Sequence, residues 1–179
     1  MPKALDIIRN EHRSICVVLD NLLSLVRGIA ERGSMINTGV FDAMVNYLET
    51  YAERVHHPKE DQYLFEAVRR HDAQAEALIA GLEREHADGE RALRDLKNSL
   101  TRYEKVGRQG FPAFEKVVED YVRVYLDHMR KEEEQVFPLA QKLLKPEDWA
   151  AIDAAFEKSR DPLAAGRDGG AQMPSQMES

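Results

Sequence analysis

This 179-residue sequence has only one cysteine, no excess of basic charge and no long apolar run. The single cysteine, Cys16, excludes a disulfide within the chain and is typical of a reducing compartment. No apolar run approaches the roughly 20 residues that a membrane-spanning helix needs. The sequence opens directly on an amphipathic pattern, without the apolar segment of a secretion signal. We therefore expect a cytoplasmic protein with no membrane partner.

The charge balance argues against nucleic acid as a partner. The chain has 25 Lys and Arg residues against 32 Asp and Glu residues, which gives a formal net charge of −7. The acidic residues are interspersed along the chain, and there is no basic stripe of the kind that neutralises phosphate groups. We expect no nucleic-acid partner, and the sequence specifies no protein partner.

Length and periodicity predict a single helical domain. A chain of this size can bury one sizeable core but is short for two domains. Apolar residues recur at steps of three and four over residues 5–29, 41–67, 78–100 and 117–143, which is the pattern of amphipathic helices. Short connections between them favour antiparallel neighbours. The predicted fold is all-α, an up-down-up-down four-helix bundle.

The C-terminal part predicts a short fifth helix and a tail. A proline and two acidic residues at 146–148 form a helix start, and apolar residues at helical spacing up to residue 156 can dock on the bundle. From residue 159 onward the sequence is rich in Gly, Pro, Ala, Ser and Gln and has few large apolar residues. We expect the bundle domain to span residues 1–158 and a disordered tail to span residues 159–179.

A pattern of metal-binding residue types occurs twice. Each half of the sequence has a Glu-His pair on its first predicted helix and a His-x-x-Lys-Glu on its second, with nearly equal separations. Residues four apart share a helix face, so each second helix can present an imidazole and a carboxylate to the same point. The six candidate metal ligands are His12, His56, Glu60, His86, His128 and Glu132.

Glu60 and Glu132 are the strongest reason to expect a metal. Both fall on the inner stripe of their helices, where an unpaired carboxylate is very costly. Lys59 and Lys131 are one residue away, about 100° off that face. A cation must therefore come from outside the sequence.

The ligand types narrow the choice of metal. Imidazole and carboxylate without a set of thiolates suit iron, manganese or zinc. Two sets of two His and one Glu are too many for one tetrahedral zinc ion. Two adjacent iron ions, bridged by the two glutamates, use all six candidate ligands. Zinc or manganese can occupy such a site in preparations.

The motifs and their order resemble the hemerythrin-like (HHE cation-binding) domains. The resemblance covers roughly residues 3–144 and is carried by His12, residues 56–61, His86 and residues 128–134. It implies a four-helix bundle around an oxo- or hydroxo-bridged di-iron centre that binds O₂ or a related small ligand. The implied assignment is His12 and His56 on one iron, His86 and His128 on the other, and Glu60 and Glu132 as bridges.

The sequence departs from the oxygen-carrying hemerythrins at one position. Those proteins have a second histidine four residues after the first on the third helix, and Glu90 stands there in this chain. The departure implies either a carboxylate ligand at Glu90 or an open coordination position, and it argues against reversible O₂ carriage. His57 and Asp61 form another pair four residues apart, about 100° from the first. We interpret them as helix surface or support for the ligands, with direct ligation as the alternative.

The leading functional hypothesis is a di-iron protein that binds O₂, NO or a peroxide in sensing, storage or detoxification. Glu11, Glu85 and Lys59 are expected in solvent, and bulky side chains between the ligands leave no room for an organic substrate. A di-iron ferroxidase or peroxidase-like enzyme is one alternative, although a histidine-rich ligand set favours binding over turnover. A metal-dependent regulatory or interaction module is the other.

Overall fold

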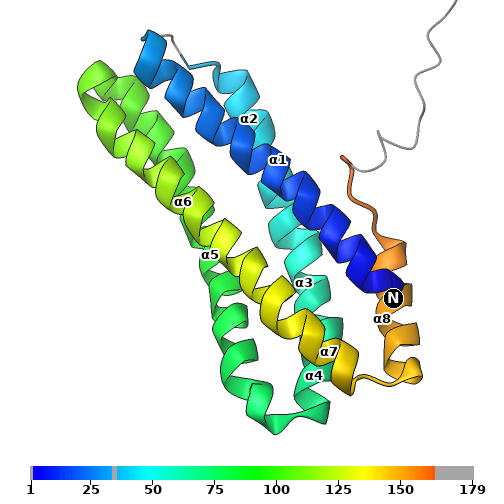
Figure 1. Ribbon diagram of the computed structural model, residues 1–179. Helices are drawn as coiled ribbons and strands as arrows, with labels where there is room; N and C mark the ends of the chain where they lie inside the picture. The colour runs from blue at the N-terminus through cyan, green and yellow to red at the C-terminus, as the bar shows by residue number, and fades with distance from the viewer. Residues whose placement is uncertain (1, 34–35, 164–179) are drawn as a thin grey trace, which may run out of the picture.

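The computed structural model describes residues 2–33 and 36–163, and throughout these ranges the regular structure is helical (Figure 1). Four long helices run alternately up and down, which confirms the predicted all-α bundle. The α-helices are α1 (Lys3–Arg32), α2 (Thr38–Tyr47), α3 (His57–Lys59), α4 (Glu66–His71), α5 (Glu76–Val106), α6 (Phe111–Lys131), α7 (Phe137–Leu143) and α8 (Pro146–Lys158). The second bundle helix comprises α2 to α4, and the fourth comprises α6 and α7.

Three widened, π-helical segments interrupt the second and fourth bundle helices. They span Leu48–His56, Glu60–Phe65 and Glu132–Val136, and short 3₁₀ turns at Ala73–Ala75 and Gly107–Gly110 flank α5. Pro58 and Pro138 lie next to these segments. A proline lacks the backbone donor that a regular α-turn requires, which accounts for the widened turns beside it. The widened turns begin or end at His56, Glu60 and Glu132, so they change the direction of candidate ligands.

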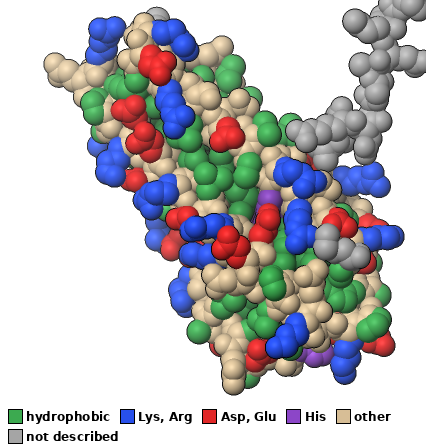
Figure 2. Space-filling view, viewed as in Figure 1, with side chains coloured by type: hydrophobic (Ala, Val, Ile, Leu, Met, Phe, Trp, Pro, Cys, Tyr) green, Lys and Arg blue, Asp and Glu red, His purple; other side chains and the backbone are tan. Residues whose placement is uncertain are grey.

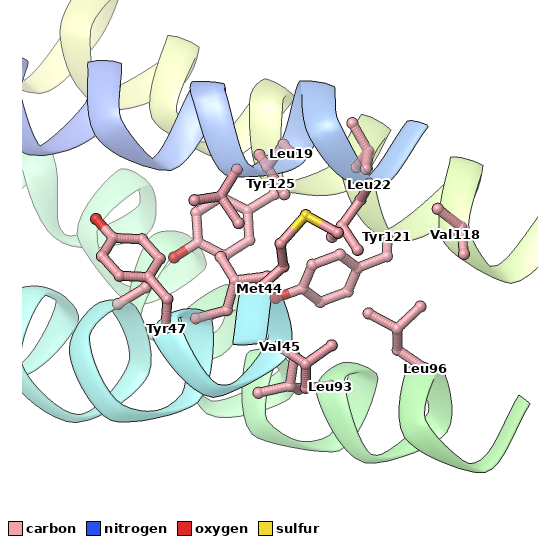
Figure 3. Packing of buried hydrophobic residues seen from close by; sticks show 14 of the residues in the cluster. Leu19, Leu22, Met44, Val45, Tyr47, Leu93, Leu96, Val118, Tyr121 and Tyr125 are labelled. Atoms are coloured by element: carbon pink, nitrogen blue, oxygen red, sulfur yellow. The ribbon is translucent and has the colours of Figure 1, made fainter. Parts of the chain in front are cut away.

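The buried apolar side chains form two clusters, one on each side of the candidate ligands. The first cluster is packed from all four bundle helices (Figure 3), and the second lies at the end of the bundle covered by α8. On α1, for example, Ile8 belongs to one cluster, Ile15 to the other, and His12 lies between them. The same order holds on α5, where His86 lies between Leu82 and Leu93. The fold therefore buries a polar layer between two apolar layers.

The fifth helix α8 packs along α1 (Figure 1). Its start is capped by Asp148, which accepts a hydrogen bond from the backbone N–H of Lys145 at 3.0 Å. Ile152 and Phe156 are buried against the bundle, as their spacing predicts. Asp153 accepts a hydrogen bond from the backbone N–H of Ala4 at 2.7 Å, which ties α8 to the start of α1.

The prediction of a disordered tail from residue 159 onward is wrong for the first residues of that range. Asp161 is 2% exposed and accepts a hydrogen bond from the hydroxyl of Tyr47 at 3.1 Å. The carbonyl of Ser159 accepts one from Lys59 at 3.2 Å. These polar contacts hold Ser159 and Asp161 against the bundle, whereas Leu163 is exposed. Residues 164–179 lie outside the described residues.

The surface is charged with both signs. Figure 2 shows acidic and basic side chains intermixed over the described part of one face, with apolar side chains between them. Across the described residues, none of the helices combines the length and the apolar character needed to cross a membrane.

Candidate metal centre

The structure brings all six predicted ligands together in the middle of the bundle. Each of the six is at most 6% exposed. The four imidazoles direct Nε2 toward the two glutamates, with Nε2–Oε distances of 3.3 Å from His12 to Glu132, 3.5 Å from His56 to Glu60, 3.5 Å from His86 to Glu132 and 3.2 Å from His128 to Glu132. One ligand atom each from His12, His56 and Glu60 lies within 4.8 Å of the others, as does one each from Glu60, His86 and Glu132.

The inward-facing atoms have unfilled bonding capacity. All four carboxylate oxygens of Glu60 and Glu132 are buried without a hydrogen-bond partner among the described residues, and so are Nε2 of His12 and Nε2 of His56. Leaving several charged acceptors without donors costs several kilocalories per mole in a dry interior. A metal ion satisfies carboxylate oxygens and imidazole nitrogens together, so this donor set fits a bound cation.

The distance between the Nε2 atoms of His86 and His128 also fits a metal ion bound by both rings. Nε2 of His86 and Nε2 of His128 lie 2.8 Å apart. Two nitrogens bound at right angles to one metal ion, each at about 2.1 Å, are separated by about 3 Å. The two rings thus already have the spacing of neighbouring ligands on a single ion.

A carboxylate lies within hydrogen-bond distance of Nδ1, the outer nitrogen, in each of the four predicted histidine ligands. Nδ1 is 2.7 Å from Glu133 in His12, 2.7 Å from Glu11 in His56, 2.7 Å from Asp61 in His86 and 2.9 Å from Glu85 in His128. A donated Nδ1–H fixes the ring orientation and leaves Nε2 to bind a metal. Every predicted histidine ligand is therefore oriented from outside as well as directed inward.

The expectation that Glu11 and Lys59 are solvated is wrong. Glu11 is 1% exposed and Lys59 is 7% exposed. Lys59 donates to Glu11 at 2.8 Å, and its ammonium lies 4.6 Å from the ring centre of Phe156 on α8. Although burial raises the pKa of Glu11, His56 and Lys59 lower it to about 2. Helix α8 thus covers a chain of contacts from Lys59 through Glu11 to His56.

The other half of the sequence repeats this arrangement. Lys131 donates to Glu85, which in turn accepts from Nδ1 of His128. Here both Glu85 and Lys131 are partly exposed, and within residues 2–33 and 36–163 no helix equivalent to α8 covers them. The repetition of Glu-His and Lys-Glu in the sequence was the signal for this arrangement, although the burial of Glu11 and Lys59 depends on neighbouring helices.

We expect the Glu11→Gln substitution to weaken iron binding about 10- to 100-fold, because a neutral amide no longer holds His56 and Lys59 electrostatically. The affinity is measured by competition with a chelator. Glu31→Gln is the matched control, since Glu31 is exposed on the same helix. Equal affinities for the two variants would contradict a role for Glu11 in supporting the ligand.

A fifth imidazole, His57, also faces the centre. His57 is 4% exposed, and one nitrogen from each of His57, His86 and His128 lies within 4.8 Å of the others. Its Nε2 accepts a hydrogen bond from the Tyr125 hydroxyl at 3.0 Å, and its Nδ1 is 3.2 Å from Glu53. Burial, together with the neighbouring imidazoles, holds the pKa of His57 well below its usual value. It is therefore a neutral ring, and its Nε2 can bind a metal once the hydrogen bond from Tyr125 is given up.

The sequence did not predict His57 as a metal ligand, because the prediction took each residue to rotate by the roughly 100° of a regular α-helix. His57 follows a π-helical segment, in which successive residues rotate by less than 100°. His56 and His57 therefore both face inward. The two prolines next to the widened turns were the available signal.

The structure does not bring Glu90 into this group. Its side chain is exposed and lies 3.9 Å from Arg94. The interior beside this turn is occupied by Glu53, since a Cβ atom added to Gly89 would lie 2.6 Å from a Glu53 carboxylate oxygen. The alternative of a carboxylate ligand at Glu90 therefore has no support in the structure, and His57 offers an imidazole on that side.

A cavity next to the centre corrects the expectation that the bundle has no room for an organic molecule. Its volume is about 370 Å³, and it lies between α5 and α6. His57, Tyr125 and His128 line its inner wall.

We expect metal-free and metal-bound protein to respond to pH in opposite directions. Burial lowers the imidazole pKa values, but Asp61 and Glu132 raise that of His86 to about 10, and Glu132 and Glu85 raise that of His128 to about 9. Both lie above the unfolded value of about 6.5. Without metal, this stabilisation is fully present below about pH 6.5 and is lost as the pH rises toward 9 and 10.

Metal-bound protein should instead lose its metal in acid, because protons compete for the same imidazoles. Unfolding with denaturant from pH 5.5 to 9.5, with and without iron, compares the two states. A free energy of unfolding that rises with pH in the metal-free protein would contradict this account.

Fold and site together define a helical-bundle protein with a buried histidine and carboxylate cation centre. The sequence model of the hemerythrin HHE cation-binding domain matches residues 3–140, which is most of the chain. The chain therefore belongs to the hemerythrin HHE cation-binding family, as its motifs predicted. Comparison with the curated proteins found no match.

Proposed function

We propose that the centre binds two iron ions and that the physiological ligand is O₂, NO or a peroxide, in sensing, storage or detoxification. The observation that carries this proposal is the set of four unpartnered oxygens of Glu60 and Glu132, surrounded by imidazole nitrogens in the dry interior. One ion would be held by His12, His56 and Glu60, and the other by His57, His86 and His128. Glu60 and Glu132 lie between the two groups and suit bridging positions.

Bound iron would supply redox chemistry and coordination positions for a small ligand. The protein's own contribution is to orient the histidine ligands and to exclude water from the centre. The outer carboxylates fix the ring orientations, and the apolar clusters on both sides keep the polar layer dry. Tyr125 is within hydrogen-bond distance of His57, so its hydroxyl lies beside one of the candidate ligands.

The test is to load the protein with Fe(II) without oxygen, record the optical spectrum, and then admit O₂ or NO. We expect new near-ultraviolet and visible absorption with each gas and no change in zinc-loaded protein, because zinc has no redox chemistry. A protein that stays colourless and retains less than one iron per chain would overturn the proposal. Consumption of many equivalents of peroxide or Fe(II) would identify an enzyme instead.

A further inference from the structure

The cavity between α5 and α6 is far larger than a small gaseous ligand requires. Its volume of about 370 Å³ falls in the range of sites for small organic molecules, roughly 300–1,000 Å³, whereas one water molecule occupies about 30 Å³. Its walls are mostly apolar, with Ala92 on α5 and Val117 and Val124 on α6. The space therefore suits a molecule with an apolar body.

Two of the residues that line this cavity each have a buried oxygen without a hydrogen-bond partner among the described residues. Glu53 has a side chain 2% exposed; one carboxylate oxygen is near His57, and the other has no hydrogen-bond partner among the described residues. The hydroxyl of Tyr121 is also buried and unpartnered in the described part of the chain. Figure 3 shows the rings of Tyr121 and Tyr125 reaching from α6 into the bundle, with both hydroxyls on the same side. A ligand that donates hydrogen bonds would satisfy both groups.

The charges around the cavity favour a cation. Five acidic residues and, among the described residues, no Lys or Arg line it. Those closer to the surface have cations nearby, such as Lys131 beside Glu85 and Arg91 beside Asp88. Glu53 is the acidic residue that reaches the inner end, and no Lys or Arg lies within ion-pair distance of it in the described structure.

We propose that this cavity binds a small organic amine, with its ammonium group at Glu53 and Tyr121 and its apolar part between α5 and α6. An ammonium group only donates hydrogen bonds, which matches the free carboxylate oxygen of Glu53 and the lone pairs of the Tyr121 hydroxyl. Burial raises the pKa of Glu53 to about 7; an ammonium group beside it would favour its charged form, whereas a carboxylate in the same place would oppose that form. This site lies beside the metal centre and does not require that iron be the metal bound there.

The test compares three probes of nearly equal shape by titration calorimetry on the full chain as purified, with its metal content measured in parallel. The probes are 2-phenylethylamine, 2-phenylethanol and phenylacetate. We expect the amine to bind at least about tenfold more tightly than the alcohol, and phenylacetate not to bind. Equal affinities for the three probes, or no binding of the amine, would overturn the proposal without any variant being needed.

Two pairs of variants locate the site. Glu53→Gln keeps an acceptor for His57 but removes the charge, so it should lower amine affinity at least about tenfold; Glu119→Gln, at an exposed position of α6, should not. Ala92→Phe should block the cavity, whereas Ala87→Phe, exposed on the same helix, should not. Amine affinity unchanged in both Glu53→Gln and Ala92→Phe would overturn the proposal.

The metal measurement separates this proposal from the di-iron function. Protein that binds the amine selectively but does not retain iron would contradict only the proposed iron chemistry. Protein that retains two iron ions but does not distinguish the three probes would contradict only the amine site.

Discussion

Substitution of both Glu60 and Glu132 by glutamine is expected to abolish iron retention. The two side chains are fully buried, and their four oxygens have no hydrogen-bond partner among the described residues, although imidazole nitrogens lie near them. Glutamine keeps their size but removes the charge that draws a cation into the interior. Iron per chain after desalting should fall from two to near zero, and the control pair Glu104→Gln and Glu134→Gln, at exposed positions, should retain both ions.

The same substitution should change how iron affects stability. Iron at 100 times its dissociation constant stabilises a protein that binds one ion by about 2.7 kcal/mol. The native protein should gain at least this much free energy of unfolding, and the double variant should gain none. In the absence of iron the double variant should still fold, because two neutral amides cost less to bury than two carboxylates. A double variant that keeps two iron ions would show that other residues hold the metal.

Removal of His57 is expected to have the second-largest effect. His57→Ala should lose one of the two iron ions or weaken its binding about 100-fold, because His57 completes the group with His86 and His128. Glu90→Ala should have no effect on either ion, since Glu90 is exposed. The measurement is iron stoichiometry by titration, with the free energy of unfolding of the metal-free variants recorded to detect any loss from the vacated volume.

His71→Ala is the matched control for His57→Ala. His71 lies at the end of α4, away from the centre, where Nε2 is 2.7 Å from Asp148. This variant should keep both ions. Full occupancy in His57→Ala would contradict a ligand role for His57, and loss of an ion in Glu90→Ala would restore the alternative of a carboxylate ligand at position 90.

The bundle could be predicted from the sequence because its helices are long and strongly periodic. A stripe that repeats every three to four residues fixes both the helix and its buried face. The duplicated His and Glu pattern then places His12, His56, Glu60 and their counterparts on those faces, and the structure brings them together. Regular helical geometry was sufficient for this part of the site.

The remaining features of the site depend on packing that a periodic pattern does not contain. His57 faces inward because the helix widens beside Pro58. Lys59 and Glu11 are buried because α8 and the carbonyl of Ser159 cover them, which involves segments about 100 residues away. The cavity is lined by Gly89, which has no side chain, and by the small side chain of Ala92, and volume of this kind is set by three-dimensional packing.

The fifth helix illustrates the difference between predicting an element and predicting its role. Its start at residue 146 and its docking residues could be predicted from local signals. Its contact with Lys59 links it to Glu11 and His56, so α8 supports one half of the metal centre. In the part of the chain that the structure describes, the other half, at Glu85 and Lys131, has no such cover and is more exposed.

Anomalous diffraction at the iron absorption edge, from crystals of protein loaded with iron without oxygen, tests the central claim most directly. The account predicts two peaks about 4 Å apart or less, one beside His12 and His56 and the other beside His86 and His128, with Glu60 and Glu132 between them. A single peak, or iron bound only outside this buried layer, would contradict it.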